Sequence, residues 1–155
     1  MPTTVVTGSA DETRAAGRRL GMVAAPGDVL LLEGPLGAGK TVLIQGLAEG
    51  LGSQADVASP TFVLVRQYGG RVDLVHADLY RLEDRAEIDA LGLLELSAEG
   101  VLVVEWADRA PWLEVEQAAR LSIAAGEGEH SRRLRLEGGP DRLHSALAGT
   151  TVAGS

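Results

Sequence analysis

The segment Gly34–Thr41, with the sequence GPLGAGKT, constrains the fold of this chain more than any other feature. It fits the phosphate-binding loop pattern G-x-x-x-x-G-K-[ST] at every fixed position. The apolar run 29–32 precedes it, and apolar residues at helical spacing follow it over 41–51. Backbone N–H groups and the positive end of a helix converge on an anion in such a strand–loop–helix unit. The sequence therefore predicts nucleotide binding on an α/β fold; a glycine-rich turn without a ligand is the alternative.

Residue types within this loop predict a nucleotide with β- and γ-phosphates and a Mg²⁺ ion. Lys40 is expected to reach the β- and γ-phosphate oxygens, and the Thr41 hydroxyl to hold Mg²⁺. The loop residues expected to contact the nucleotide are Gly37, Ala38, Gly39, Lys40, Thr41 and Val42.

Helical and extended patterns alternate along the rest of the chain, which is typical of α/β proteins. They predict an architecture like that of P-loop NTPases: a mostly parallel central sheet flanked by helices, with antiparallel hairpin strands. The further predicted elements are a helix over 10–25 with a capping box at Ser9–Glu12, a hairpin of 62–68 and 71–77 turning at Gly69-Gly70, a helix over 81–91, a strand over 101–104, and a hairpin of 119–123 and 133–136.

The length of 155 residues, of which 45% are hydrophobic, suits one domain with its own core. Residues 1–139 are expected to form a single P-loop domain. Residues 140–155 are rich in small residues and are expected to be a C-terminal tail with a short helix and a frayed end.

Two acidic residues follow predicted strands and are candidate catalytic residues. Glu105 comes directly after the apolar run 101–104 and is a candidate Mg²⁺ ligand; a carboxylate facing solvent is the alternative. Asp78 ends another strand, where it could orient water or the metal. His76 precedes it by two residues, and a lone histidine at a strand end favours a hydrogen-bonded structural role over that of a catalytic base.

Three further features are less specific taken one at a time. Ser59-Pro60-Thr61 could fold over a γ-phosphate as a switch loop, or could be an ordinary turn. For Trp106, packing in the core and a role in the nucleotide site are equally compatible with the sequence. For Arg132 and Arg133, an exposed strand face is favoured over a phosphate clamp.

Four motifs together closely resemble the TsaE family, also called YjeE, of small bacterial P-loop ATPases needed to make threonylcarbamoyladenosine in tRNA. They are GPLGAGKT at 34–41, SPTF at 59–62, HADLYRL at 76–82 and VEW at 104–106. The resemblance covers approximately Ser9 to Leu136. It implies weak ATP hydrolysis by the isolated protein and action on a complex of the TsaB and TsaD proteins.

The resemblance also implies roles for single residues. It makes Thr41 and Glu105 the Mg²⁺ ligands and Lys40 part of the phosphate cradle. It further implies that Thr61 is the switch-loop threonine, that Asp78 and Trp106 serve hydrolysis, and that Ser9 and Arg132 border the nucleotide. Pro35 departs from the family pattern, which usually has Asp at this position, and removes a backbone N–H at the edge of the loop.

Composition limits the other classes of function. Fourteen basic and twenty-two acidic residues give a net charge of −8, which opposes strong direct binding to tRNA. There is no cysteine, no long apolar run and no basic, apolar leader pattern, so a cytoplasmic protein without membrane contact is expected. The alternative functions are a small-molecule kinase and a nucleotide-gated binding module without turnover.

Overall fold

The computed structural model describes residues 2–35, 39–53, 65–79, 84–89, 91–106 and 118–153 of the chain, with the side chains of 85 and 150–153 excepted. The elements in chain order are β1 (Thr3–Thr7), α1 (Ala10–Val23), β2 (Val29–Glu33), α2 (Lys40–Gly50), β3 (Val65–Tyr68), β4 (Leu74–Asp78), α3 (Arg85–Asp89), α4 (Leu93–Leu96), β5 (Val101–Glu105), β6 (Ala119–Ala125), β7 (Arg132–Gly138) and α5 (Asp141–Ala153).

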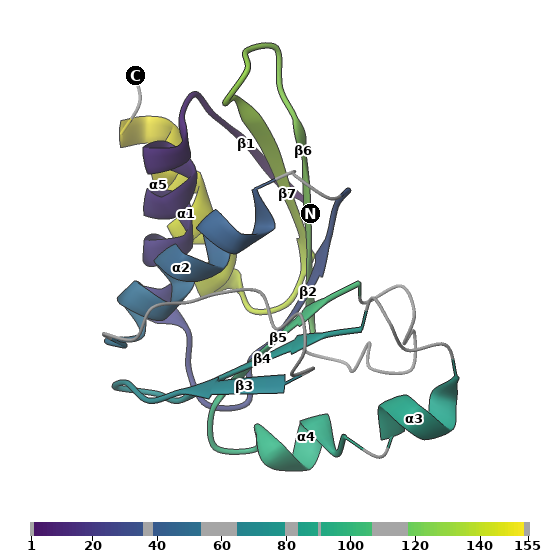
Figure 1. The fold of residues 1–155 in the computed structure, drawn as a ribbon. Coiled ribbons are helices and arrows are strands. Elements are labelled where there is room, and N and C mark those ends of the chain that lie inside the picture. The colour runs from purple at the N-terminus through teal and green to yellow at the C-terminus, as the bar shows by residue number, and fades with distance from the viewer. Residues whose placement is uncertain are drawn as a thin grey trace.

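The strands form one seven-stranded sheet within the described ranges, in the order β1-β7-β6-β2-β5-β4-β3 (Figure 1). The central strands β6, β2, β5 and β4 are mutually parallel. Antiparallel pairing of β3 with β4, and of β7 with both β6 and β1, completes the two ends. The predicted α/β architecture, with a parallel centre and antiparallel hairpins, is confirmed.

Helices cover both faces of the sheet (Figure 1). One core cluster joins α1, α2 and α5 to side chains such as Leu32 and Val103, and a second joins α3 and α4 to Leu31 and Val104. The apolar runs of β2 and β5 supply alternate residues to both clusters, as expected of central parallel strands. The sheet therefore holds the carboxyl end of β2 firmly beside that of β5.

Helix α1 begins as predicted, with Ser9 as its N-cap. The Ser9 hydroxyl accepts a hydrogen bond from the Glu12 N–H at 3.2 Å, and the Glu12 carboxylate accepts one from the Gly8 N–H at 2.8 Å. The helix ends at Val23, two residues before the predicted end, because Ala24 is extended with ψ 143°. The next residue, Ala25, precedes Pro26 and is disfavoured in a helix.

The prediction of a two-residue turn at Gly69-Gly70 is wrong. Tyr68 pairs with Leu74, so residues 69–73 form the connection between β3 and β4. Tertiary contacts account for the difference: the Arg71 N–H donates to the Leu51 carbonyl at 2.6 Å, and the Arg71 guanidinium donates to the Gly21 carbonyl at 2.9 Å. These bonds tie the connection to the ends of α2 and α1.

Three other elements differ from the sequence prediction. The helix expected over 81–91 appears as α3, whose neighbours 80–83 and 90 lie outside the described residues. The one-turn helix α4 and the edge strand β1 were not predicted, although the β-branched run TTVVT is typical of a strand. No helix within the described ranges is both long and apolar enough to cross a membrane.

The expected C-terminal tail is helix α5 in its described part. Leu143 and Leu147 are fully buried in the same core cluster as α1 and α2. Arg142 donates two hydrogen bonds to the buried carboxylate of Asp28, at 2.5 and 2.6 Å. This pair raises the pKa of the Arg142 guanidinium above its ordinary value. The helix is thereby attached to the turn between α1 and β2.

Candidate active site

The lysine of the phosphate-binding loop is the first residue of α2, and it is buried. Gly39, the N-cap of this helix, has φ 96°, a left-handed conformation that glycine adopts at little cost. The Lys40 ammonium donates a hydrogen bond to the Gly34 carbonyl at 2.8 Å and lies 4.3 Å from the centre of the Trp106 ring. The lysine therefore folds back onto the start of its own loop.

Two carboxylates end neighbouring strands at the same edge of the sheet. Glu105 pairs in register with Leu32 of β2 on one side and with Asp78 of β4 on the other. The loop that begins after β2 leaves from this edge. The structure therefore brings Asp78, Glu105 and the start of α2 to one edge of the sheet. Carboxyl ends of parallel strands are the usual ligand-binding edge of such sheets.

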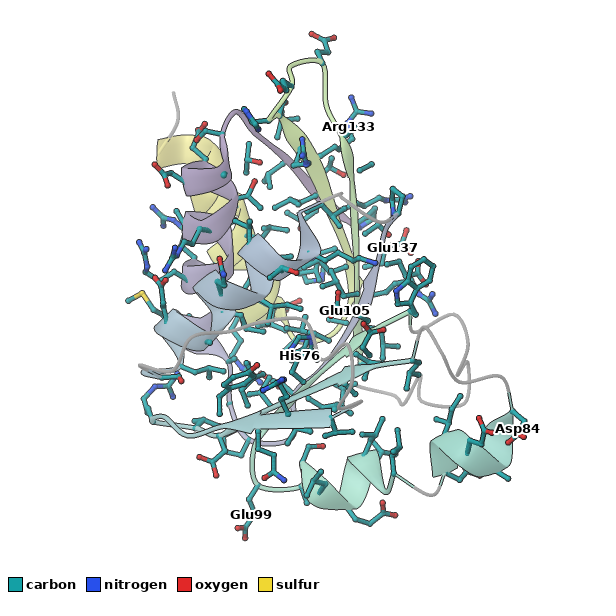
Figure 2. The ribbon with its side chains drawn as sticks, viewed as in Figure 1. His76, Asp84, Glu99, Glu105, Arg133 and Glu137 are labelled. Atoms are coloured by element: carbon teal, nitrogen blue, oxygen red, sulfur yellow. The ribbon has the colours of Figure 1, made fainter. Side chains whose placement is uncertain are left out.

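The two acids differ in their surroundings. Asp78 is half-buried, whereas the Glu105 side chain is only 4% exposed. The Glu105 carboxylate is hydrogen-bonded to the Nε2 atom of His76 at 2.6 Å (Figure 2). A buried carboxylate needs such a partner, since removing an isolated charge from water is costly. The alternative reading of Glu105 as a carboxylate facing solvent is therefore excluded.

His76, Asp78 and Glu105 share the face of the sheet that carries α2. Leu74 lies two residues before His76 on β4, and Val103 two residues before Glu105 on β5, so each shares a face with the residue that follows it. Both belong to the core cluster of α1 and α2. From its sequence, His76 is expected to make only a structural hydrogen bond. The signal that could have found its partner was the parallel register, which places residue 76 on the same face as 105.

Trp106 has an unusual backbone conformation. Its φ is 60°, and it is the one residue other than glycine with positive φ in the described part of the chain. Such conformations cost free energy and gather at functional sites. The side chain packs against the second core cluster and its ring faces Lys40, so Trp106 belongs to the core and also lies beside the lysine of the loop. With Glu33, Gly34 and Pro35 it lines an open hollow of about 340 Å³ beside the loop.

Arg132 and Ser9 lie along the same edge of the sheet, on the other side of the loop. Arg132 begins β7 and pairs with Thr7, so Ser9 follows directly beyond this pair. The Arg132 side chain passes beside Gly39: a Cβ built there would lie 3.4 Å from the arginine Nε. Its guanidinium also donates to the carbonyls of Glu129 and Ser131. Arg132 is thus placed where it could contact a phosphate, and Arg133 is exposed.

The residue types at this edge fit a magnesium nucleotide. No cluster of three or more metal-binding side chains exists among the described residues. Mg²⁺ commonly uses one or two protein oxygens together with substrate phosphates, so the Thr41 hydroxyl and the Glu105 carboxylate suffice as protein donors. The buried ammonium of Lys40 and the N-terminus of α2 supply the positive charge that phosphates require.

Part of the predicted site lies outside the described residues, namely Gly37, Ala38, Thr61 and the loop 59–62 that contains it. Val42 lies in the first turn of α2 and is half-buried. The roles assigned to the individual site residues stay predictions.

Comparison with known proteins gives a consistent result. A family model described as threonylcarbamoyl adenosine biosynthesis protein TsaE matches residues 7–134. Two similar proteins are both named tRNA threonylcarbamoyladenosine biosynthesis protein TsaE. The one from Bacillus subtilis is 50% identical over 63% of this chain and 61% of its own length. The one from Streptomyces coelicolor is 40% identical over 79% of this chain and 85% of its own length. The match thus spans less than two thirds of the Bacillus protein.

A solved structure shares the whole fold. The crystal structure of Bacillus subtilis YdiB superposes with a TM-score of 0.75 and 27% sequence identity, covering 100% of this chain and 97% of that one. The similarity therefore includes α5 and β1, which flank the residues matched by the family model.

Proposed function

The chain belongs to the TsaE family, whose members are named for threonylcarbamoyladenosine biosynthesis. On that premise we propose that it is a Mg²⁺-dependent P-loop ATPase that supports this tRNA modification by acting on the TsaB–TsaD complex. In isolation it is expected to hydrolyse ATP slowly, because no arginine finger or catalytic glutamine can be assigned from its sequence.

One observation carries the proposal: the buried Lys40 ammonium begins α2 at the same edge of the sheet where Glu105 and Asp78 end their strands. Removing the charge of a lysine from water costs free energy unless an anion or another partner compensates for the lost hydration. Among the described residues, its partners are a carbonyl and an aromatic face, both neutral. A triphosphate is the natural anionic partner for this position.

The described residues divide the work of such a reaction. Lys40 binds the β- and γ-phosphates, and the N–H groups at the start of α2 bind the same anion. Thr41 and Glu105 hold Mg²⁺, which when bound neutralises charge on the phosphate oxygens. Asp78, half-buried beside Glu105, orients the attacking water.

The partners follow from the family and from charge. A net charge of −8 disfavours tight binding to tRNA, so the protein acts through partner proteins that bind the tRNA themselves. In this scheme ATP orders the loop that contains Thr61, the ordered loop favours one state of the TsaB–TsaD complex, and hydrolysis releases it.

A phosphate-release assay tests the proposal. ATP hydrolysis is measured with and without TsaB and TsaD, and separately with a panel of hydroxyl-bearing metabolites as phosphate acceptors. We expect stimulation by the two proteins alone, loss of activity in Lys40→Ala, and unchanged activity in Arg133→Ala, which removes an exposed positive charge. Transfer of phosphate to a metabolite would show a kinase instead. Nucleotide binding without turnover, with the partners present, would show a binding module.

A further inference from the structure

The buried pair of His76 and Glu105 has a feature that the proposed ATPase activity does not use. The His76 side chain is fully buried and that of Glu105 is 4% exposed, and the atoms Nε2 and Oε2 lie 2.6 Å apart (Figure 2). The other ring nitrogen of His76, Nδ1, is buried and has no hydrogen-bond partner within the described part of the chain. The Tyr68 ring lies beside the imidazole, with 6.4 Å between the ring centres.

Stability alone is a weak reason for this arrangement. Buried ion pairs and hydrogen-bonded polar pairs contribute little compared with apolar side chains of similar volume. An unpartnered buried nitrogen adds a further cost. Two of the neighbouring positions on this face, Leu74 and Val103, are apolar and buried in the core, so an apolar residue at 76 would match them. The pair is better explained by what it does to the carboxylate.

An ionised carboxylate can only accept hydrogen bonds, so the hydrogen between the two groups belongs to His76 Nε2. This tautomer leaves Nδ1 as the bare nitrogen, an acceptor with no donor among the described residues. The bond immobilises Oε2 and stops rotation of the carboxylate about its last torsion. The second oxygen, Oε1, is then the one available to a cation or to water bound to it.

We propose that His76 is a positioning residue for Mg²⁺, which orients the Glu105 carboxylate through the Nε2–Oε2 hydrogen bond. This inference rests on the proposed function, because it assumes that Glu105 serves the cation. Hydrogen-bond partners of metal-binding carboxylates set the orientation of the ligand, and their loss typically weakens metal affinity about 10- to 100-fold. His76 itself touches neither nucleotide nor metal.

Three variants separate orientation from mere packing. His76→Leu removes the donor and keeps an apolar side chain of similar size. In His76→Gln the side-chain amide can present an N–H near the position of Nε2, whereas His76→Asn is one carbon shorter. The affinity of Mn²⁺, a spectroscopic substitute for Mg²⁺, is measured by electron paramagnetic resonance in the presence of ATP. ATP affinity in EDTA and the thermal midpoint are measured in parallel.

We expect His76→Leu to weaken Mn²⁺ binding about 10- to 100-fold while ATP affinity in EDTA is unchanged, and His76→Gln to recover most of the loss. His76→Asn should recover less. Unchanged Mn²⁺ affinity in a folded His76→Leu would overturn the proposal. If that variant does not fold, equal Mn²⁺ affinities of the Gln and Asn variants would overturn it as well.

A double-mutant cycle locates the effect. In a Glu105→Gln background, His76→Leu should cause no further loss of Mn²⁺ affinity, because the carboxylate that it orients is gone. An equal loss in both backgrounds would mean that His76 acts elsewhere. Failure of the unmodified protein to bind ATP with Mn²⁺ would instead overturn the proposed function, so the two failures are distinguishable.

Discussion

The ammonium of Lys40 lies 4.3 Å from the centre of the Trp106 indole ring. A cation over an indole face is attracted by the ring electrons, and the Gly34 carbonyl holds the same ammonium at 2.8 Å. Trp106 directly follows Glu105, so this contact links the phosphate-binding loop to the strand that carries the candidate Mg²⁺ ligand. A nucleotide that binds Lys40 must compete with both partners.

The chain offers a direct probe of this contact, because Lys40 is its only lysine. Protein labelled with ¹³C-lysine should show a single Cε–Hε signal, shifted upfield by the Trp106 ring current. Mg-ATP should move the signal toward the ordinary lysine position as the ammonium turns to the phosphates. In Trp106→Leu the signal should start near that position. An upfield shift that persists at saturating Mg-ATP would contradict the competition.

Replacing Lys40 by Ala should weaken Mg-ATP binding by about 100-fold, because charge-assisted hydrogen bonds to phosphate contribute roughly 1.5–3 kcal/mol. Isothermal titration calorimetry measures the effect. Arg133→Ala provides a control that also removes one exposed positive charge. Unchanged affinity in Lys40→Ala would remove the central assignment.

Replacing Asp78 by Asn should spare ATP binding and lower the partner-stimulated kcat about 100-fold, since an amide carries no negative charge and cannot accept a proton from the attacking water. Steady-state kinetics and calorimetry together separate the two effects. Asp73→Asn changes an exposed acid just before the same strand and should alter neither. Equal losses of binding and turnover would make Asp78 a structural residue.

The contact between α1 and α2 depends on glycine. A Cβ at Gly46 would overlap the carbonyl oxygen of Arg14, so the two helices meet through their backbones. Gly46→Ala must push them apart and should lower the free energy of unfolding by about 1–3 kcal/mol, despite the better helix propensity of alanine. Urea denaturation measures this. Gly128→Ala, where the new methyl makes an ordinary 3.6 Å contact, should be near neutral.

Glu49 should give the stability a measurable pH dependence. The hydrogen bond from Arg14 lowers the pKa of the Glu49 carboxyl below its ordinary value. Burial acts in the opposite direction and raises the pKa, whereas Arg18 lowers it further. A carboxyl whose pKa is lower in the folded state stabilises the protein above its unfolded pKa of about 4.3 and loses that effect as the pH falls through the folded pKa.

Glu49→Gln should therefore lower the free energy of unfolding at pH 7 by at most about 1 kcal/mol, since the pair is partly solvent-exposed. The difference from the unmodified protein should shrink below about pH 4. Chemical denaturation across this range tests it, with the exposed Glu99→Gln as control. A difference that does not vary with pH would exclude the ion pair as its cause.

Local chemistry made much of this protein predictable. The runs 29–32 and 101–104 are apolar at every position because both faces of these strands are covered. Ser9 and Glu12 form their cap within a few residues of each other, so no distant contact is needed. The wrong turn at Gly69-Gly70 shows the limit: the dipeptide suits a tight turn, but hydrogen bonds from Arg71 to the ends of two helices determine the connection.

By itself the sequence determined the strand–loop–helix unit, the acids that end two strands, and the family. These depend on residues that are close neighbours along the chain. Only the tertiary structure decided that His76 is hydrogen-bonded to Glu105, twenty-nine positions away, and that the Lys40 ammonium lies over the Trp106 ring. Both contacts follow from strand order and register, which arise from the packing of all elements together and from no local pattern.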